Sequence, residues 1–115
     1  IFTPQQAPPD YAHHVGAGLV LRRESLRANA QQVNYLRPHI VKMSQRYNSL
    51  DMPMEIVHGD ADTIVPLSVH SEPLSKQVAG ARLTVLSGVG HMPHHAAPDE
   101  VEAAIDRAAS RAGLR

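Results

Sequence analysis

The sequence predicts an α/β fold, on the strength of three observations. Two short segments, residues 54–58 and 82–87, are apolar, rich in β-branched residues and bounded by Pro or Gly, which is typical of largely buried strands. Residues 68–78 between them have helical character and stop before Gly80. Because a strand, a helix and a strand in this order form a right-handed crossover, the two strands are expected to lie parallel and adjacent.

Helices are predicted before the first strand. Residues 1–9 are Pro-rich and polar, typical of a linker, and Pro9 suits the first position of a helix, although Gly16 and Gly18 disfavour its continuation. A second helix is expected to follow, and Pro38 should end it or start another. The three predicted apolar stripes are Tyr11, Val15 and Leu19; then Leu26, Ala30, Val33 and Leu36; then Ile40, Met43 and Tyr47.

The last helix has the clearest signals. Pro98 suits its first position, acidic residues follow in the first turn, Arg107 and Arg111 lie near its end, and Gly113 stops it. The stripe predicted to be buried is Val101, Ala104, Ile105, Ala108 and Ala112.

Two parallel strands do not make a stable sheet, because both faces and both edges need cover. The chain has 115 residues, opens on Ile rather than Met and shows no signal-peptide pattern. We therefore expect a larger sheet, completed by a missing N-terminal half that is either covalently attached or a separate chain.

Composition excludes several classes of function. Lys+Arg and Asp+Glu both number 11, so no excess of charge favours nucleic acid or an anionic membrane. No apolar run reaches the length of a membrane span. Cysteine is absent, which excludes disulfides, thiolate metal ligands and a Cys nucleophile. A cytoplasmic location is compatible with this composition and is our expectation.

Each predicted strand runs into a turn that presents a titratable side chain. Asp62 follows the first strand in Gly-Asp-Ala-Asp, and His91 follows the second in Gly-Val-Gly-His, 29 residues later. Parallel strands bring their carboxyl ends to one sheet edge, where sites of open α/β sheets gather. The pair therefore predicts an Asp that accepts a hydrogen bond from His Nδ1–H, the orienting half of a nucleophile–His–acid triad.

Other interpretations of these residues exist. Asp60 and Asp62 could each simply cap a turn, as short acids often do. His91, His94 and His95 form a cluster that could bind a metal ion. His58, at the end of the first strand, is expected to pack or hydrogen-bond rather than to take part in catalysis.

These motifs resemble the C-terminal part of an α/β-hydrolase. The matching residues, about 50–115, are H-G-D-A-D-x-I-V-P, a helix, A-x-L-x-V-L-x-G-V-G-H-M-P-H and a final amphipathic helix. In that family the acid follows the penultimate strand and the His follows the last, so the resemblance implies Asp62, rather than Asp60, as acid and His91 as base. It also implies a helical cap or lid in residues 1–50 and a part of the hydrolase core in residues 51–115.

The resemblance implies a serine-type, esterase-like or lipase-like hydrolase that cleaves a carboxylic ester or related acyl bond without metal or organic cofactor. The family's G-x-S-x-G nucleophile elbow is absent, so we expect the nucleophile in the missing N-terminal half and no activity from the chain alone. The expected substrate is a small apolar ester. Candidate cap residues for its pocket, unless they only pack on one another, are Tyr11, Leu19, Leu21, Tyr35, Leu36 and Met43.

Two further functions remain open at this point. An Asp nucleophile in the missing half would turn the same acid and His toward dehalogenation or epoxide opening. A protein of the same fold could also bind ligands without catalysis.

Overall fold

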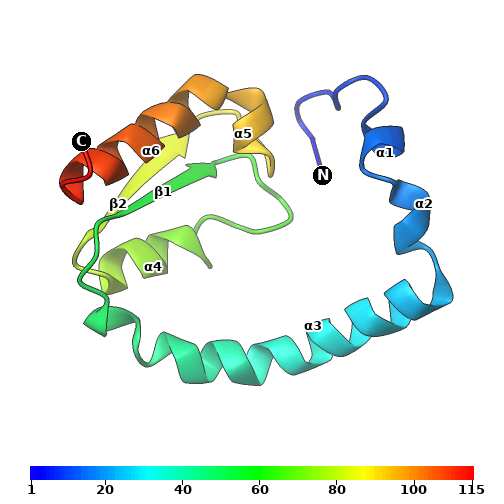
Figure 1. Ribbon diagram of the computed structural model, residues 1–115, viewed down its shortest axis with the longest axis horizontal. Helices are drawn as coiled ribbons and strands as arrows, with labels where there is room; N and C mark the ends of the chain where they lie inside the picture. Colours follow the sequence, from blue (N-terminus) through cyan, green and yellow to red (C-terminus); the bar gives the residue numbers. More distant parts are fainter. The chain divides into compact units, whose positions relative to one another are not determined.

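The computed structural model describes all 115 residues as a mixed α/β protein with two parallel strands and several helices (Figure 1). Strands β1 (Met54–Gly59) and β2 (Ala81–Leu86) pair in parallel along their whole length. Helix α4 (Ser71–Gln77) connects them, shorter than the predicted helix but in the predicted place. The predicted strand–helix–strand unit is therefore confirmed, with each strand within one residue of its expected bounds.

The chain divides into two compact units. The helical unit comprises Ala7–Arg46, and the strand unit comprises Ile1–Gln6 together with Tyr47–Arg115. The sequence placed the division after residue 50 and assigned the first residues to the helical part, whereas contacts in the structure assign them to the strand unit.

The helical unit corrects two predictions. In place of one helix, α1 (Tyr11–His14) and α2 (Ala17–Val20) are separated by Gly16, whose φ of 62° ends the first helix. Helix α3 (Arg23–Ser44) runs without interruption through Pro38, so the expected break there is wrong. Proline removes one hydrogen bond and clashes with one carbonyl, which a helix of 22 residues tolerates because its other turns stay bonded.

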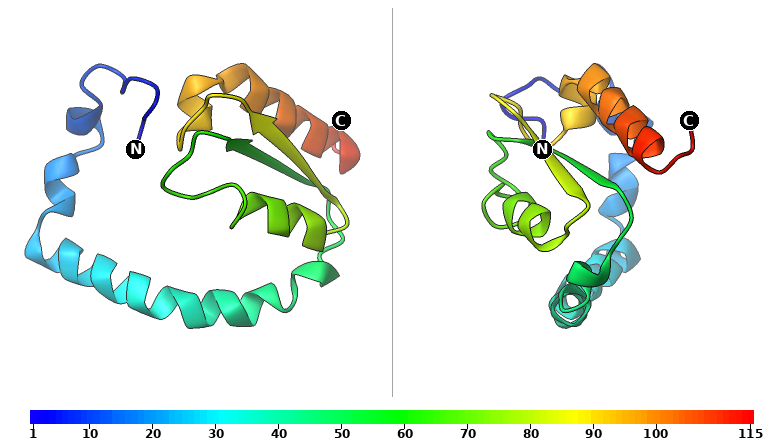
Figure 2. Two further views of the ribbon diagram at one scale, coloured as in Figure 1. Left: turned by 180° about the vertical axis from the view of Figure 1, so that it is seen from behind. Right: turned by 90° about the vertical axis from the view of Figure 1, so that its left-hand side faces the viewer.

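In the strand unit, α4 and α6 (Pro98–Arg111) lie on opposite faces of the strand pair (Figure 2). Ion pairs hold α6 to β1: the buried carboxylate of Glu55 accepts hydrogen bonds from Arg107 Nε at 3.2 Å and Arg111 Nη1 at 2.7 Å. Burial raises the pKa of Glu55, but the two guanidinium groups lower it further than burial raises it. The final helix is thus fixed by charge as well as by apolar contact.

The core of the strand unit is small. Its buried apolar residues are Phe2, Val78 and Ala104, and most strand residues are half-buried rather than largely buried as predicted. Ile105, predicted to be buried on α6, is 60% exposed, and Ala112 is exposed too. Each strand is paired on one side only, so the outer edge of each strand lacks a neighbouring strand.

A short 3₁₀ turn (Tyr47–Ser49) precedes β1, and helix α5 (Pro93–Ala96) follows the turn after β2. None of the helices combines the length and the apolar character needed to cross a lipid bilayer.

Candidate active site

The turns that follow β1 and β2 are bonded to each other. The amide of Asp60 donates to the Leu86 carbonyl at 3.0 Å, and the amide of Ala61 donates to the Val89 carbonyl at 3.0 Å. The carboxylate of Asp60 accepts the amide hydrogen of Gly88 at 2.7 Å. Asp60 therefore has the capping role considered for it, but it caps an amide of the turn after β2 rather than an amide of its own turn.

Glycine permits close backbone contacts at two positions around these turns. A Cβ atom on Gly59 would overlap the Val89 carbonyl oxygen, and one on Gly90 would overlap the Thr3 carbonyl oxygen. The neighbours in both places are backbone atoms, which cannot move aside as a flexible side chain can. A larger residue at Gly59 would push the two turns apart, and one at Gly90 would push the second turn away from the N-terminal segment at Thr3.

Asp62 and His91 lie in direct contact across the turns. His91 Nδ1 is 2.8 Å from Asp62 Oδ2, which is the hydrogen bond expected from the sequence. The other oxygen, Oδ1, accepts the amide hydrogens of Ile64 at 2.8 Å and Val65 at 2.9 Å. Asp62 thus caps its own turn and also faces the histidine, so the two interpretations of this residue hold together.

The protonation pattern follows from these contacts. Burial of the Asp62 carboxyl, 5% exposed, raises its pKa, but hydrogen bonds from Val65, His91 and Ile64 outweigh burial and lower the pKa from 3.8 to about 2. An ionised carboxylate only accepts hydrogen bonds, so His91 Nδ1 carries the hydrogen. In the neutral ring, Nε2 is then the basic nitrogen.

His91 Nε2 is open for proton transfer. It makes no hydrogen bond with the protein, and the His91 side chain is 30% exposed. A hollow of about 180 Å³ borders the pair, lined by the turns and the start of α5. Its other lining residues are Val57, His58, Gly59, Val65, Gly90 and Pro93.

Two features of the site were not predicted from the sequence. The first is Gln5, whose side-chain amide donates to the Gly88 carbonyl at 2.8 Å and accepts the Gly90 amide hydrogen at 2.9 Å. Phe2, in the same segment, is buried, and its ring lies edge-on to the ring of His95 with the centroids 5.4 Å apart. The segment interpreted as a linker therefore supports the turn that bears His91, and an aromatic residue in a polar stretch was the one hint of it.

The second is a buried pair formed by His58 and Ser71, with 2.6 Å between His58 Nδ1 and Ser71 Oγ. His58 was expected to hydrogen-bond, but its partner could not be named because α4 begins 13 residues later.

The metal-site alternative has no geometry to support it. The rings of His94 and His95 lie side by side with centroids 4.6 Å apart. No group of three His, Asp or Glu side chains in the structure could hold a metal ion. The three histidines of the cluster do not converge.

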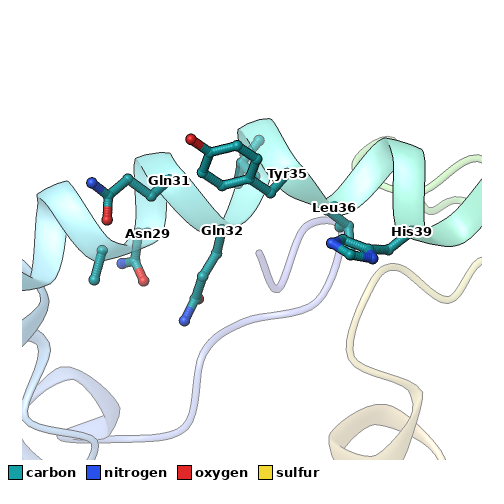
Figure 3. A pocket seen from close by; sticks show the side chains of 8 residues that line it. Asn29, Gln31, Gln32, Tyr35, Leu36 and His39 are labelled. Atoms are coloured by element: carbon teal, nitrogen blue, oxygen red, sulfur yellow. The ribbon is translucent and has the colours of Figure 1, made fainter.

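The helical unit has a hollow of its own. It measures about 720 Å³ and is lined by α3 alone, with Tyr35, Leu36 and His39 along it (Figure 3). The predicted cap residues on α3 are exposed, Tyr35 by 68% and Leu36 by 55%. Neither Asp62 nor His91 belongs to this hollow.

Compared with known proteins, the chain matches no protein-family model, no curated protein and no solved structure.

Proposed function

We propose that this chain supplies the acid and the base of an α/β-hydrolase-type esterase, with Asp62 orienting His91. The observation that carries the proposal is the 2.8 Å hydrogen bond from His91 Nδ1 to Asp62 Oδ2, combined with an open Nε2. Both groups follow neighbouring parallel strands at their carboxyl ends, the usual place for sites in such sheets.

The chemistry follows from the tautomer. His91 Nε2 takes the proton from a serine hydroxyl as the serine oxygen attacks the ester carbonyl. Asp62 stabilises the imidazolium that forms. The imidazolium then returns the proton to the leaving alcohol. In the second half, His91 activates a water molecule that releases the acid from the acyl-serine and restores the hydroxyl.

The serine belongs, in this proposal, to a polypeptide segment outside these 115 residues. The chain has no G-x-S-x-G elbow, and its buried Ser71 contacts His58 rather than His91. Strands paired on one side only leave room for the further strands that would carry the nucleophile. The exposed apolar side chains of α3, including Tyr35 and Leu36, suit a cap over a small apolar ester.

The test uses the polypeptide that contains these residues, purified intact. Its mass and any co-purifying chain are measured together with hydrolysis of p-nitrophenyl butyrate and labelling by a fluorophosphonate. We expect activity, and a labelled serine outside residues 1–115. Unlabelled and inactive protein of mass greater than 12.5 kDa would contradict the proposal. Activity with no serine label would instead indicate a different nucleophile.

A further inference from the structure

His58 uses both ring nitrogens although it is nearly sealed from solvent. Its Nε2 is 2.9 Å from the Val65 carbonyl oxygen and its Nδ1 is 2.6 Å from Ser71 Oγ. His58 and Ser71 are each only 8% exposed. The pair therefore joins the end of β1 to the start of α4 through the loop between them.

The partners determine the tautomer of His58. A carbonyl oxygen only accepts, so Nε2 carries the hydrogen. In the neutral ring Nδ1 then accepts, and the Ser71 hydroxyl donates to it. Ser71 thereby favours the tautomer that bonds Val65.

Val65 connects this pair to Asp62. The Val65 carbonyl accepts from His58 at 2.9 Å, while the Val65 amide donates to Asp62 Oδ1 at 2.9 Å. The same His58 Nε2 lies 3.6 Å from Asp62 Oδ2, the oxygen that His91 contacts. His58 therefore acts on Asp62 through the loop backbone and also faces the carboxylate directly.

We infer that His58 and Ser71 are positioning residues, which hold the Asp62–Val65 loop so that Asp62 presents Oδ2 to His91. Their role as a support for catalysis depends on the proposed function, whereas the positioning itself is a property of the chain. The contacts Ser71–His58–Asp62 have the order of a triad, but Ser71 is buried and bonds Nδ1, so it is not placed to attack a substrate.

The experiment compares His58→Leu with His58→Gln in the full chain. Leucine has no donor, whereas a glutamine amide can place an N–H near the former Nε2 and so bond Val65. We measure the pKa of Asp62 by carboxyl ¹³C NMR and the His91 Nδ1–H signal by ¹⁵N NMR. In His58→Leu the Val65 carbonyl loses its donor, so the loop shifts and the hydrogen bond from the Val65 amide to Asp62 is lost. The Asp62 pKa should then rise from about 2 toward 3.8, and the His91 Nδ1–H signal should broaden. His58→Gln should stay close to the wild type.

Ser71→Ala provides a second, milder variant in case His58→Leu does not fold. It should shift the Asp62 pKa in the same direction by a smaller amount. Its matched control is Ser75→Ala, because the Ser75 hydroxyl bonds only the Glu72 carbonyl of its own helix. Unfolding of all variants is followed by circular dichroism.

A purely structural role would lower the unfolding midpoint and leave the Asp62 pKa and the His91 signal unchanged in every folded variant, and that result would overturn the inference. In an active preparation, kcat of His58→Leu or Ser71→Ala should fall about 10- to 100-fold with KM unchanged. If the His91→Ala variant stays active, the proposed function fails, while the NMR result still decides whether His58 positions Asp62.

Discussion

His58 and His91 point a ring nitrogen at the same oxygen of Asp62, yet their surroundings differ. His91 Nδ1 is 2.8 Å from Oδ2 and the side chain is 30% exposed, whereas His58 Nε2 is 3.6 Å away with a side chain 9% exposed. His58 has partners on both nitrogens, and His91 keeps Nε2 open.

The difference suits the two histidines to different roles: one can hold a loop in place, and the other can exchange a proton. A histidine with both nitrogens bonded inside the protein cannot exchange a proton with a substrate, but it can fix a loop. A histidine bonded on one side and open on the other is oriented and still able to accept a proton. Asp62 lies between the two, and the experiments below remove one contribution at a time.

The largest effect is expected from His91→Ala. In an active preparation, kcat should fall about 10⁴- to 10⁶-fold because the general base is removed. Steady-state hydrolysis of p-nitrophenyl butyrate measures it, with His70→Ala as the matched control, since His70 is an exposed histidine at the start of α4. Comparable turnover in both variants would refute the role of His91.

Asp62→Asn should lower kcat about 10³- to 10⁴-fold, because an amide can donate to Nδ1 and so favour the wrong tautomer. The matched control is Asp60→Asn, whose amide oxygen can still accept the Gly88 hydrogen, and its cost should be less than about tenfold. Equal losses in the two variants would mean that Asp62 is only a turn residue.

Gly59→Ala tests whether contact of the two turns matters. The added Cβ would overlap the Val89 carbonyl, so the variant should lose about 1–3 kcal/mol of unfolding free energy and about 100-fold in kcat. Urea unfolding and ester hydrolysis measure the two effects. Gly18→Ala is the control, because a Cβ there meets nothing within 4 Å. A Gly59→Ala protein with wild-type stability and activity would show that the turns can separate at no cost.

The smallest effect concerns stability in acid. The folded-state pKa of Asp62 is lowered from 3.8 to about 2, so its stabilising contribution is present above pH 3.8 and is lost as pH falls toward 2. Urea unfolding across that window should show wild-type stability falling more steeply than that of Asp62→Asn. Glu55, whose pKa is also lowered, contributes in the same direction, and Glu55→Gln serves for comparison. Parallel slopes in wild type and Asp62→Asn would contradict the lowered pKa.

The part of the fold that sequence predicts well is the part governed by local pattern and topology. The strand–helix–strand unit and the last helix follow from periodicity, Pro and Gly, and the parallel pairing brings Asp62 and His91 to one edge. The hydrogen bond between them was expected for that reason and is present. Their roles as acid and base stay a prediction.

Local sequence pattern does not predict contacts between segments far apart in the chain, nor helices that depend on cooperative hydrogen bonding. The Gln5 side chain hydrogen-bonds Gly88 and Gly90, which are 83 and 85 residues away along the chain, and no sequence spacing predicts these contacts. The partner of His58 depends on the residue at which α4 begins. Pro38 disfavours a helix locally, yet the bonded turns on both sides carry α3 through it.

The most direct test of the central claim is the tautomer of His91, measured by long-range ¹H–¹⁵N NMR on the uniformly labelled chain at neutral pH. We predict that the neutral form of the ring carries its hydrogen on Nδ1 and has a bare Nε2, and that this pattern changes in Asp62→Asn. A hydrogen on Nε2 in the wild type, with an unchanged spectrum in Asp62→Asn, would contradict it.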